Sequence, residues 1–209
     1  MTYHKPLIPC LLALCALPAG SQAATLLSEN FNELTPMLTA TSVGAFSAIS
    51  GTNVDIVGGG IFGYLCVAPA AGNCVDMDGS NGLSQGVLRS NTAFTLAPGV
   101  NYFLSFDLIG SQRGNTASTT VSFGPYANTF TLASGDDTSG IVSNALVTVS
   151  TPTTAFLTFT SNTPGNIGNV LDNVVITSSS PVGVPEPATL GLMALGLAGV
   201  GFARRKRRG

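Results

Sequence analysis

Short segments in which apolar and polar residues alternate constrain this chain more than any other feature. The clearest runs from Tyr102 to Ile109, where Tyr102, Leu104, Phe106 and Leu108 share one face. Glycine- and proline-rich breaks separate such segments, and no long helical period appears between the two ends of the chain. Many short strands without crossover helices predict an all-β fold, an antiparallel β-sandwich.

Further strands are predicted wherever a similar alternation or a short apolar run is bounded by turn residues. They fall at residues 25–31, 54–57, 74–77, 85–89, 93–96, 118–123, 129–133, 145–149, 154–160 and 172–177. Together with 102–109 they predict one domain over residues 24–177, followed by a short linker of small residues and proline at 178–184.

The first 23 residues have the pattern of a secretory signal peptide. His4 and Lys5 supply the positive start, residues 7–17 form the apolar core, and Ser21-Gln22-Ala23 is a small-x-small cleavage site. We expect cleavage after Ala23.

The last 25 residues contain three parts in a fixed order. An apolar run at 188–203 lies between a proline-flanked acidic triplet and a basic end; these are Pro185, Glu186 and Pro187, and then Arg204, Arg205, Lys206, Arg207 and Arg208. An uncharged run of 16 residues satisfies its backbone in lipid as a helix, and the cations after it hold that end on the cytoplasmic side. It is just short of the roughly 17–25 residues of a permanent span.

This ordered tail resembles the sorting signal of PEP-CTERM proteins. The resemblance implies a bacterial protein exported through the cytoplasmic membrane, held briefly by a transmembrane helix at 188–203, and processed by exosortase near the triplet. It implies a final place at the cell surface, the outer membrane or the extracellular matrix of a Gram-negative bacterium. The alternative is an ordinary single-span anchor with a basic stop-transfer end.

The domain itself is acidic, although the whole chain has a formal charge of only −2. Only Arg89 and Arg113 lie between the two ends, against nine acids: Glu29, Glu33, Asp55, Asp76, Asp78, Asp107, Asp136, Asp137 and Asp172. Two cations against nine acids give −7. This balance argues against nucleic acid as a partner, because such binding needs clustered Lys and Arg, and it favours divalent cations.

Two cysteines lie within the predicted domain, Cys66 and Cys74, with seven residues between them. In an oxidising compartment this pair predicts one disulfide that closes a short loop. The alternatives are a metal clip, which needs more ligands than two thiols, and a redox pair, which usually has the closer Cys-x-x-Cys spacing.

The predicted domain contains few of the residue types that commonly serve in catalysis. The only histidine, His4, lies in the signal peptide, so triads with an imidazole and His-ligated metal sites are excluded from the domain. The domain has no lysine and no phosphate-binding glycine motif. A paired-carboxylate hydrolase is the remaining enzymatic possibility. We expect no enzymatic activity.

A second resemblance covers most of the domain. The segments 75–80, 83–85, 96–108 and 170–174 (VDMDGS, LSQ, LAPGVNYFLSFDL and VLDNV) are similar to jelly-roll domains of the galactose-binding-like superfamily, including DUF642-type domains of bacterial surface proteins. The resemblance implies a jelly-roll form of the sandwich. It rests on spacing and strand character, and it therefore concerns the fold more than the function.

Domains of this kind often hold a structural Ca²⁺ where the first and last strands meet. The residues at those places are Glu29, Glu33 and Asp172, which we expect as possible calcium ligands, with no other cofactor. The alternative is that both glutamates are solvated and Asp172 caps a turn. The segment 76–82 also begins like a calcium loop but lacks the distal Glu, so it is more simply a strand end with Asp76 and Asp78 on one face.

Sugar binding usually needs an aromatic platform, and the chain has no Trp. Phe62, Tyr64 and Tyr126 lie near Gly-rich turns and could serve, or they could be core residues. We expect a structural or adhesive protein of exopolysaccharide or biofilm, with exosortase as its processing partner. The alternative is a carbohydrate-binding module for exopolysaccharide or a cell-surface glycan.

Overall fold

The alternating segments form strands, and every strand pairing is antiparallel. The computed structural model describes residues 23–58, 66, 72–80, 85–135 and 145–179, all within a unit spanning Gln22–Val182. A second unit, residues 1–21 and 183–209, lies outside the described residues together with the predicted membrane helix. No helix within the described ranges is long and apolar enough to cross a membrane.

The strands in chain order are β1 (Ala23–Glu29), β2 (Met37–Ala40), β3 (Ser42–Val43), β4 (Phe46–Ala48), β5 (Val54–Gly58), β6 (Asn73–Asp76), β7 (Val87–Ser90), β8 (Phe94–Leu96), β9 (Tyr102–Ile109), β10 (Ala117–Phe123), β11 (Tyr126–Leu132), β12 (Ala145–Val147), β13 (Thr153–Ala155), β14 (Leu157–Ser161) and β15 (Val170–Ser179).

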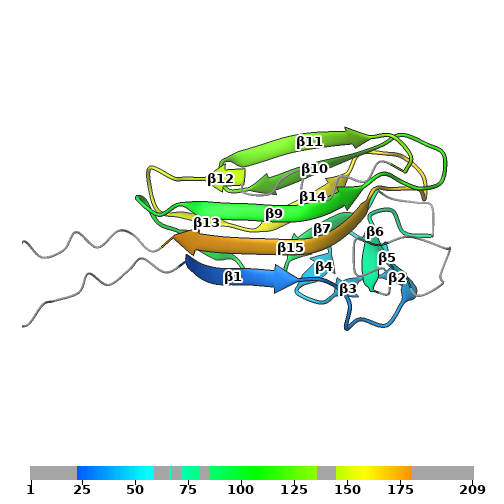
Figure 1. Ribbon diagram of the computed structural model, residues 1–209, viewed down its shortest axis with the longest axis horizontal. Coiled ribbons are helices and arrows are strands. Elements are labelled where there is room, and N and C mark those ends of the chain that lie inside the picture. Colours follow the sequence, from blue (N-terminus) through cyan, green and yellow to red (C-terminus); the bar gives the residue numbers. More distant parts are fainter. Residues whose placement is uncertain (1–22, 59–65, 67–71, 81–84, 136–144, 180–209) are drawn as a thin grey trace, which may run out of the picture. The chain divides into compact units, whose positions relative to one another are not determined.

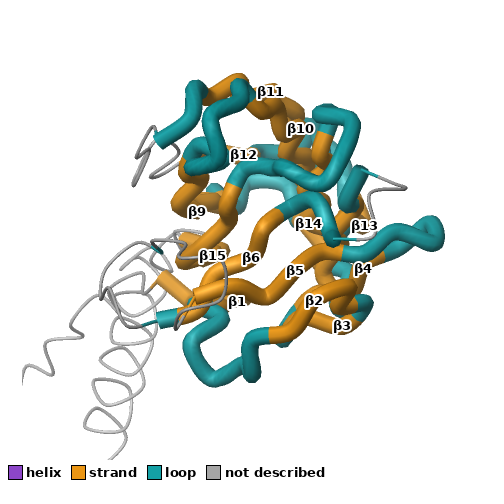
Figure 2. The backbone as a smooth tube through the Cα atoms, turned by 90° about the vertical axis from the view of Figure 1, so that its right-hand side faces the viewer, coloured by secondary structure: helices purple, strands orange, loops and turns teal. Residues whose placement is uncertain are grey.

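Two large sheets and one small one contain these strands. The seven-stranded sheet has the order β12-β9-β15-β6-β5-β2 (Figures 1 and 2). The first residues of β15, Val170 and Leu171, pair with β6, and residues 174–179 of the same strand pair with β1. The six-stranded sheet has the order β11-β10-β14-β7-β4-β3, and β13 pairs with β8 separately. Apart from the hairpins β3–β4 and β10–β11, most neighbouring strands in the two large sheets are far apart in the sequence, so the fold depends largely on long-range pairing.

The inward residues of the two large sheets meet in one hydrophobic core. Phe106 of β9 contacts Phe159 of β14 edge to face, with ring centroids 5.3 Å apart. Phe159 in turn contacts Phe46 of β4 at 6.0 Å. These rings are fully buried or nearly so, and edge-to-face pairs add to the free energy gained by burying their area. The contacts join the two sheets face to face, which confirms the predicted all-β antiparallel sandwich.

The structure corrects several boundaries. β15 continues through Ser179, so the predicted linker at 178–184 begins with two residues that belong to the sheet. The predicted strand at 154–160 is interrupted at Phe156, because β13 and β14 pair in different sheets. The short strands β2, β3 and β4 were not predicted; they have two to four residues each, too few for a clear alternation.

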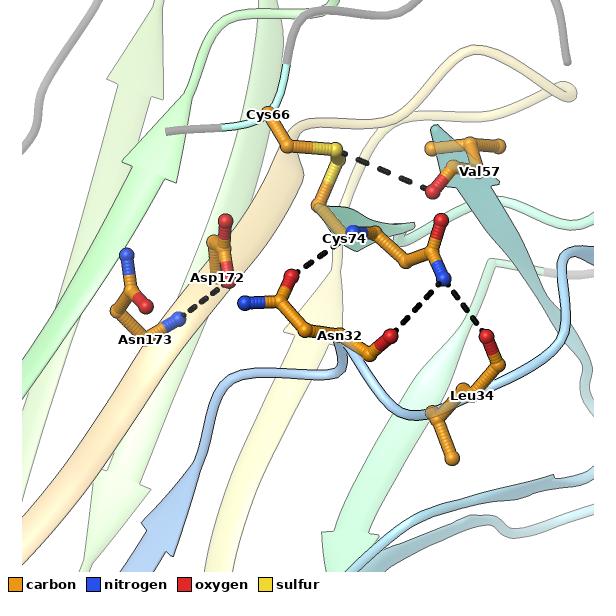
Figure 3. Close-up of a disulfide and its surroundings, with 8 residues drawn as sticks. Asn32, Leu34, Val57, Cys66, Cys74, Asp172 and Asn173 are labelled. Atoms are coloured by element: carbon orange, nitrogen blue, oxygen red, sulfur yellow. Dashed lines mark hydrogen bonds between the residues drawn. A yellow bond between two sulfur atoms is a disulfide. The ribbon is translucent and has the colours of Figure 1, made fainter. Parts of the chain in front are cut away.

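The predicted disulfide is present between Cys66 and Cys74 (Figure 3). Both cysteines are buried with Val57, Ile109 and Val170 in a second, smaller apolar cluster. The Asn73 side chain donates to the carbonyl of Leu34 at 2.6 Å, and the Asn32 side chain accepts from the Asn73 amide at 2.9 Å. The bridge therefore lies where β6 is hydrogen-bonded to the chain that follows β1.

Candidate functional site

The outer surface of the six-stranded sheet is lined with hydroxyl groups. Along β10 and β14 the inward residues are buried and the alternate ones are partly exposed. Because side chains alternate across a strand, the outward positions form one surface. We call this surface the hydroxyl face; its members are Ser42, Ser47, Ser118, Thr120, Ser122, Thr129, Thr131, Thr158 and Thr160.

The strand register places these residues in rows across the sheet. One row follows Ser47, Arg89, Thr158 and Ser122 over β4, β7, β14 and β10, each pair being directly opposite. A second row joins Thr160, Thr120 and Thr129 across β14, β10 and β11. Neighbouring strands are about 4.8 Å apart, so hydroxyls repeat at that spacing along the second row and between Thr158 and Ser122 of the first, where Arg89 separates them from Ser47.

Some of the hydroxyls are bonded to each other and others remain available. The Thr120 and Thr129 hydroxyls are 2.8 Å apart, and the Asn162 amide donates to Thr120 Oγ1 at 2.8 Å. The hydroxyls of Ser122 and Thr158 have no side-chain hydrogen bond to any other residue that the structure describes. A hydroxyl both donates and accepts, so this row can bond a polar ligand from either side.

The hydroxyl face carries little charge. Arg89 is its one cation among the described residues, and its guanidinium lies over the ring of Phe156, with Cζ 4.5 Å from the ring centroid. Phe156 is 38% exposed, which makes it an accessible aromatic ring beside the rows. A nearly uncharged surface with hydroxyls and one stacked aromatic ring suits an uncharged hydroxylated ligand better than an ion.

Carboxylates gather instead on the seven-stranded sheet, where they hold loops by accepting backbone amides. Asp55 and Asp76 are directly opposite on β5 and β6, and both are almost fully buried. Asp55 accepts the amides of Thr39 at 2.7 Å and Ser80 at 3.1 Å. Asp76 accepts Asp78 and Gly168 amides at 3.1 Å and forms an ion pair with Arg113 at 2.8 Å.

The surroundings of Asp78 differ from those of Asp55 and Asp76. The sequence predicted that Asp76 and Asp78 share a face. Asp76 is paired with Arg113, whereas the Asp78 carboxyl lies beside Ser161, an inward residue of β14, and accepts the Gly86 amide at 3.2 Å. Burial raises the pKa of Asp78, against the opposing effects of the Ser161 hydroxyl, the Gly86 amide and the Arg113 charge.

The three residues predicted as calcium ligands have separate surroundings. Glu29 Oε1 accepts the Phe31 amide at 2.9 Å and Oε2 accepts the Ala45 amide at 2.8 Å. Glu33 is exposed, and Asp172 is buried opposite Asp107 and accepts the Asn173 amide (Figure 3). Within the described ranges no three His, Cys, Asp or Glu side chains form a group that could hold a metal. Calcium at this set stays a prediction.

Of the aromatic residues proposed as a sugar platform, only Tyr126 lies among the described residues. It is half-buried against the core, and burial raises the pKa of its phenol. Phe62 and Tyr64 lie outside the described residues. The accessible ring is instead that of Phe156, which alternation had placed within a strand.

Sequence reasoning identified neither the hydroxyl face nor the Arg113–Asp76 ion pair. The outward Ser and Thr positions of β10 and β14 could be read from alternation alone. Their assembly into rows required the strand order β11-β10-β14-β7, which joins segments separated by up to several tens of residues. The ion pair joins residues 37 positions apart, and no local pattern signals it.

The chain carries a PEP-CTERM protein-sorting motif at residues 183–208, and this confirms the resemblance of the tail. The motif marks an exported protein that passes the membrane and is sorted by exosortase. No curated protein matches the chain.

Solved structures similar to the chain include the CBM22-1 and GH10 modules of endo-1,4-beta-D-xylanase 10B from Clostridium thermocellum, complexed with xylohexaose. The TM-score is 0.47 with 16% identity, over 75% of this chain and 28% of that one. Another is an exo-beta-1,3-galactanase variant from Phanerochaete chrysosporium with beta-1,3-galactotriose, at a TM-score of 0.35 and 12% identity, over 72% and 29%. This chain spans less than a third of either neighbour.

Proposed function

We propose that the exported domain binds a neutral polysaccharide on its hydroxyl face and acts as a structural or adhesive component of the cell surface or extracellular matrix. The sorting motif directs the chain out of the cytoplasm. Outside the cell, polysaccharide is an abundant partner. The observation that carries the proposal is the continuous row Ser47, Arg89, Thr158 and Ser122 across four strands.

Hydrogen-bonding capacity supports a sugar as the ligand. An extended glycan presents hydroxyls along its length, and each hydroxyl of the face can donate to one sugar oxygen while it accepts from another. The ring of Phe156 offers an apolar surface on which a sugar ring could stack. A large antiparallel sheet holds these groups rigidly, so little conformational entropy is lost when they bind.

Charge supports a neutral polysaccharide in particular. The domain has a formal charge of −7 from two cations and nine acids, and a polyanion would be repelled by it. The face itself contributes only Arg89, which is engaged with Phe156. Binding should therefore depend little on ionic strength, unlike binding driven by charge.

Co-sedimentation tests this proposal. The full chain in mild detergent is mixed with neutral polysaccharide purified from the producing cells, and with alginate as the anionic comparison. A triple variant, Thr120→Val, Thr158→Val and Thr160→Val, removes three hydroxyls and keeps the side-chain shape and strand preference. At about 0.5–1.5 kcal/mol for each hydrogen bond, its affinity should fall at least about tenfold.

The matched control is Thr95→Val, which removes an exposed hydroxyl from β8, outside the hydroxyl face. It should bind as the parent does. Equal binding of the parent and the triple variant, or binding only to alginate, would contradict the proposal.

A further inference from the structure

Four buried side-chain atoms have no hydrogen-bond partner within the described residues, and all four are acceptor oxygens. They are Asn53 Oδ1, Asp78 Oδ2, Asn115 Oδ1 and Asn169 Oδ1. A buried polar atom without a partner is costly and is rare in folded proteins. Because each of these atoms is an acceptor, each could be satisfied by a hydrogen-bond donor or by a cation.

All four oxygens belong to residues held against two chain segments, 77–79 and 167–169. The Met77 amide donates to the Asn169 carbonyl at 2.9 Å, which joins the two segments. The Gly79 amide donates to the Asn53 carbonyl at 3.2 Å, and the Asn115 side chain donates to the Ile167 carbonyl at 3.2 Å. The four residues that carry the unpartnered oxygens therefore lie on, or are hydrogen-bonded to, two segments that are joined to each other.

Asp78 and Asn169 are linked a second time through side chains. The Asp78 carboxyl lies beside the Ser161 hydroxyl, Ser161 is directly opposite Thr119, and Asn169 Nδ2 donates to Thr119 Oγ1 at 3.1 Å. These linked residues, Asp78, Ser161, Thr119 and Asn169, are each at most 1% exposed. With the Met77–Asn169 bond they close a ring of polar groups between the two sheets, which we call the polar ring.

The charge around the polar ring is negative. Asp78 forms no ion pair with a described residue, because the one nearby cation, Arg113, is paired with Asp76. Asp55 lies opposite Asp76 and adds a further carboxylate. A buried carboxylate is unfavourable unless it takes up a proton, is paired with a cation or coordinates a metal.

The geometry points to a cation site in the polar ring, with Ca²⁺ as its ion and Asp78 Oδ2 and Asn169 Oδ1 as ligands. The hydroxyls of Ser161 and Thr119 supply further oxygens. Calcium accepts carboxylate, amide and other neutral oxygens in flexible geometry, whereas Mg²⁺ demands an octahedron and keeps its waters. Zinc prefers nitrogen and sulfur ligands, and the ring has none. This site differs from the set Glu29, Glu33 and Asp172.

The test is calcium titration of the full chain after chelation, followed by calorimetry and metal analysis. We expect one Ca²⁺ per chain at the polar ring and a rise in Tm of about 5–10 °C at calcium one hundredfold above its Kd. Asp78→Asn keeps the size of the side chain and removes its charge. It should abolish both the binding and the rise in Tm.

Glu33→Gln is the matched control, because Glu33 is exposed and belongs only to the other predicted set. It should behave as the parent does. A second variant, Asn169→Asp, adds a carboxylate to the ring and should tighten calcium binding at least tenfold while lowering the Tm of the metal-free protein.

Three results would overturn the inference. The first is no calcium binding by the parent at millimolar concentration, which would leave water or a proton as the missing donor. The second is a calcium effect that survives in Asp78→Asn and is lost in Glu33→Gln. The third, which decides the matter if Asp78→Asn does not fold, is an Asn169→Asp protein that binds calcium no more tightly than the parent.

Discussion

The guanidinium of Arg89 lies over the ring of Phe156, with Cζ 4.5 Å from the ring centroid. Arg89 stands in a row of the hydroxyl face, and Phe156 interrupts the chain between β13 and β14. The pair thus fixes the one described cation of the face against an aromatic ring at its margin.

This stacking should be measurable as a coupling energy. In a double-mutant cycle with Arg89→Gln and Phe156→Leu, the coupling should be about 0.5–1 kcal/mol, the size of a partly exposed cation–π contact. Urea unfolding of the four proteins gives the value. Strict additivity of the two single changes would show that the two side chains do not interact.

Removing Asp76 from its ion pair with Arg113 should cost more stability than removing Arg113. Asp76 is 1% exposed and also accepts two backbone amides, whereas the Arg113 side chain is 30% exposed. Asp76→Asn should therefore cost about 3 kcal/mol, because it leaves buried groups without their partner. Arg113→Gln should cost less, about 1 kcal/mol. Unfolding experiments that found the reverse order would contradict this assignment.

The disulfide should stabilise the domain mainly through its unfolded state. Cys66 and Cys74 are eight positions apart, and the chain-entropy model gives about 2.5 kcal/mol for so short a loop. A Cys66→Ser, Cys74→Ser double variant should lose that amount in denaturant unfolding. Adding reductant should destabilise the parent and leave the double variant unchanged; an equal response of the two proteins would argue against the bridge.

Asp78 should give the metal-free protein a particular pH dependence. Its pKa in the folded chain is raised above its ordinary value of 3.8 by burial, so between these two pKa values the folded state binds more protons than the unfolded state. Its contribution to stability is then fully present below pH 3.8 and is lost as the pH rises through the folded pKa.

Asp78→Asn cannot lose a proton, so in chelator it should be the more stable protein near neutral pH. The difference from the parent should shrink as the pH falls toward 3.8. Thermal melts of both proteins across that range measure it. A difference that grows in acid would mean that the Asp78 carboxylate is stabilised in the folded chain.

The elements that could be predicted from the sequence are those whose pattern lies within one short segment of the chain. Tyr102–Ile109 was predicted with its observed bounds, because its alternating residues face the core on one side. The two cysteines were paired because both lie within one short loop. Met37 and Leu38 gave no such signal; they are exposed apolar residues on the short strand β2.

Both sites depend on distant pairings and could not be predicted in the same way. Thr158 becomes a neighbour of Arg89 only through the pairing of β14 with β7. Asn169 is bonded to Met77, the residue before Asp78, only because the segment before β15 returns to the end of β6. Asp76 and Asp78 looked equivalent in the sequence and both are buried, yet of the two only Asp76 forms an ion pair with a described residue.

The central claim is that the hydroxyl face binds neutral glycan, and amide chemical shifts report on it most directly. The isotope-labelled full chain is titrated with soluble fragments of neutral polysaccharide from the producing cells, and the shift changes are mapped by residue. We predict changes concentrated on β4, β7, β10 and β14, including Arg89, Ser122 and Thr158. Changes confined to the seven-stranded sheet, or none at saturating fragment concentration, would contradict it.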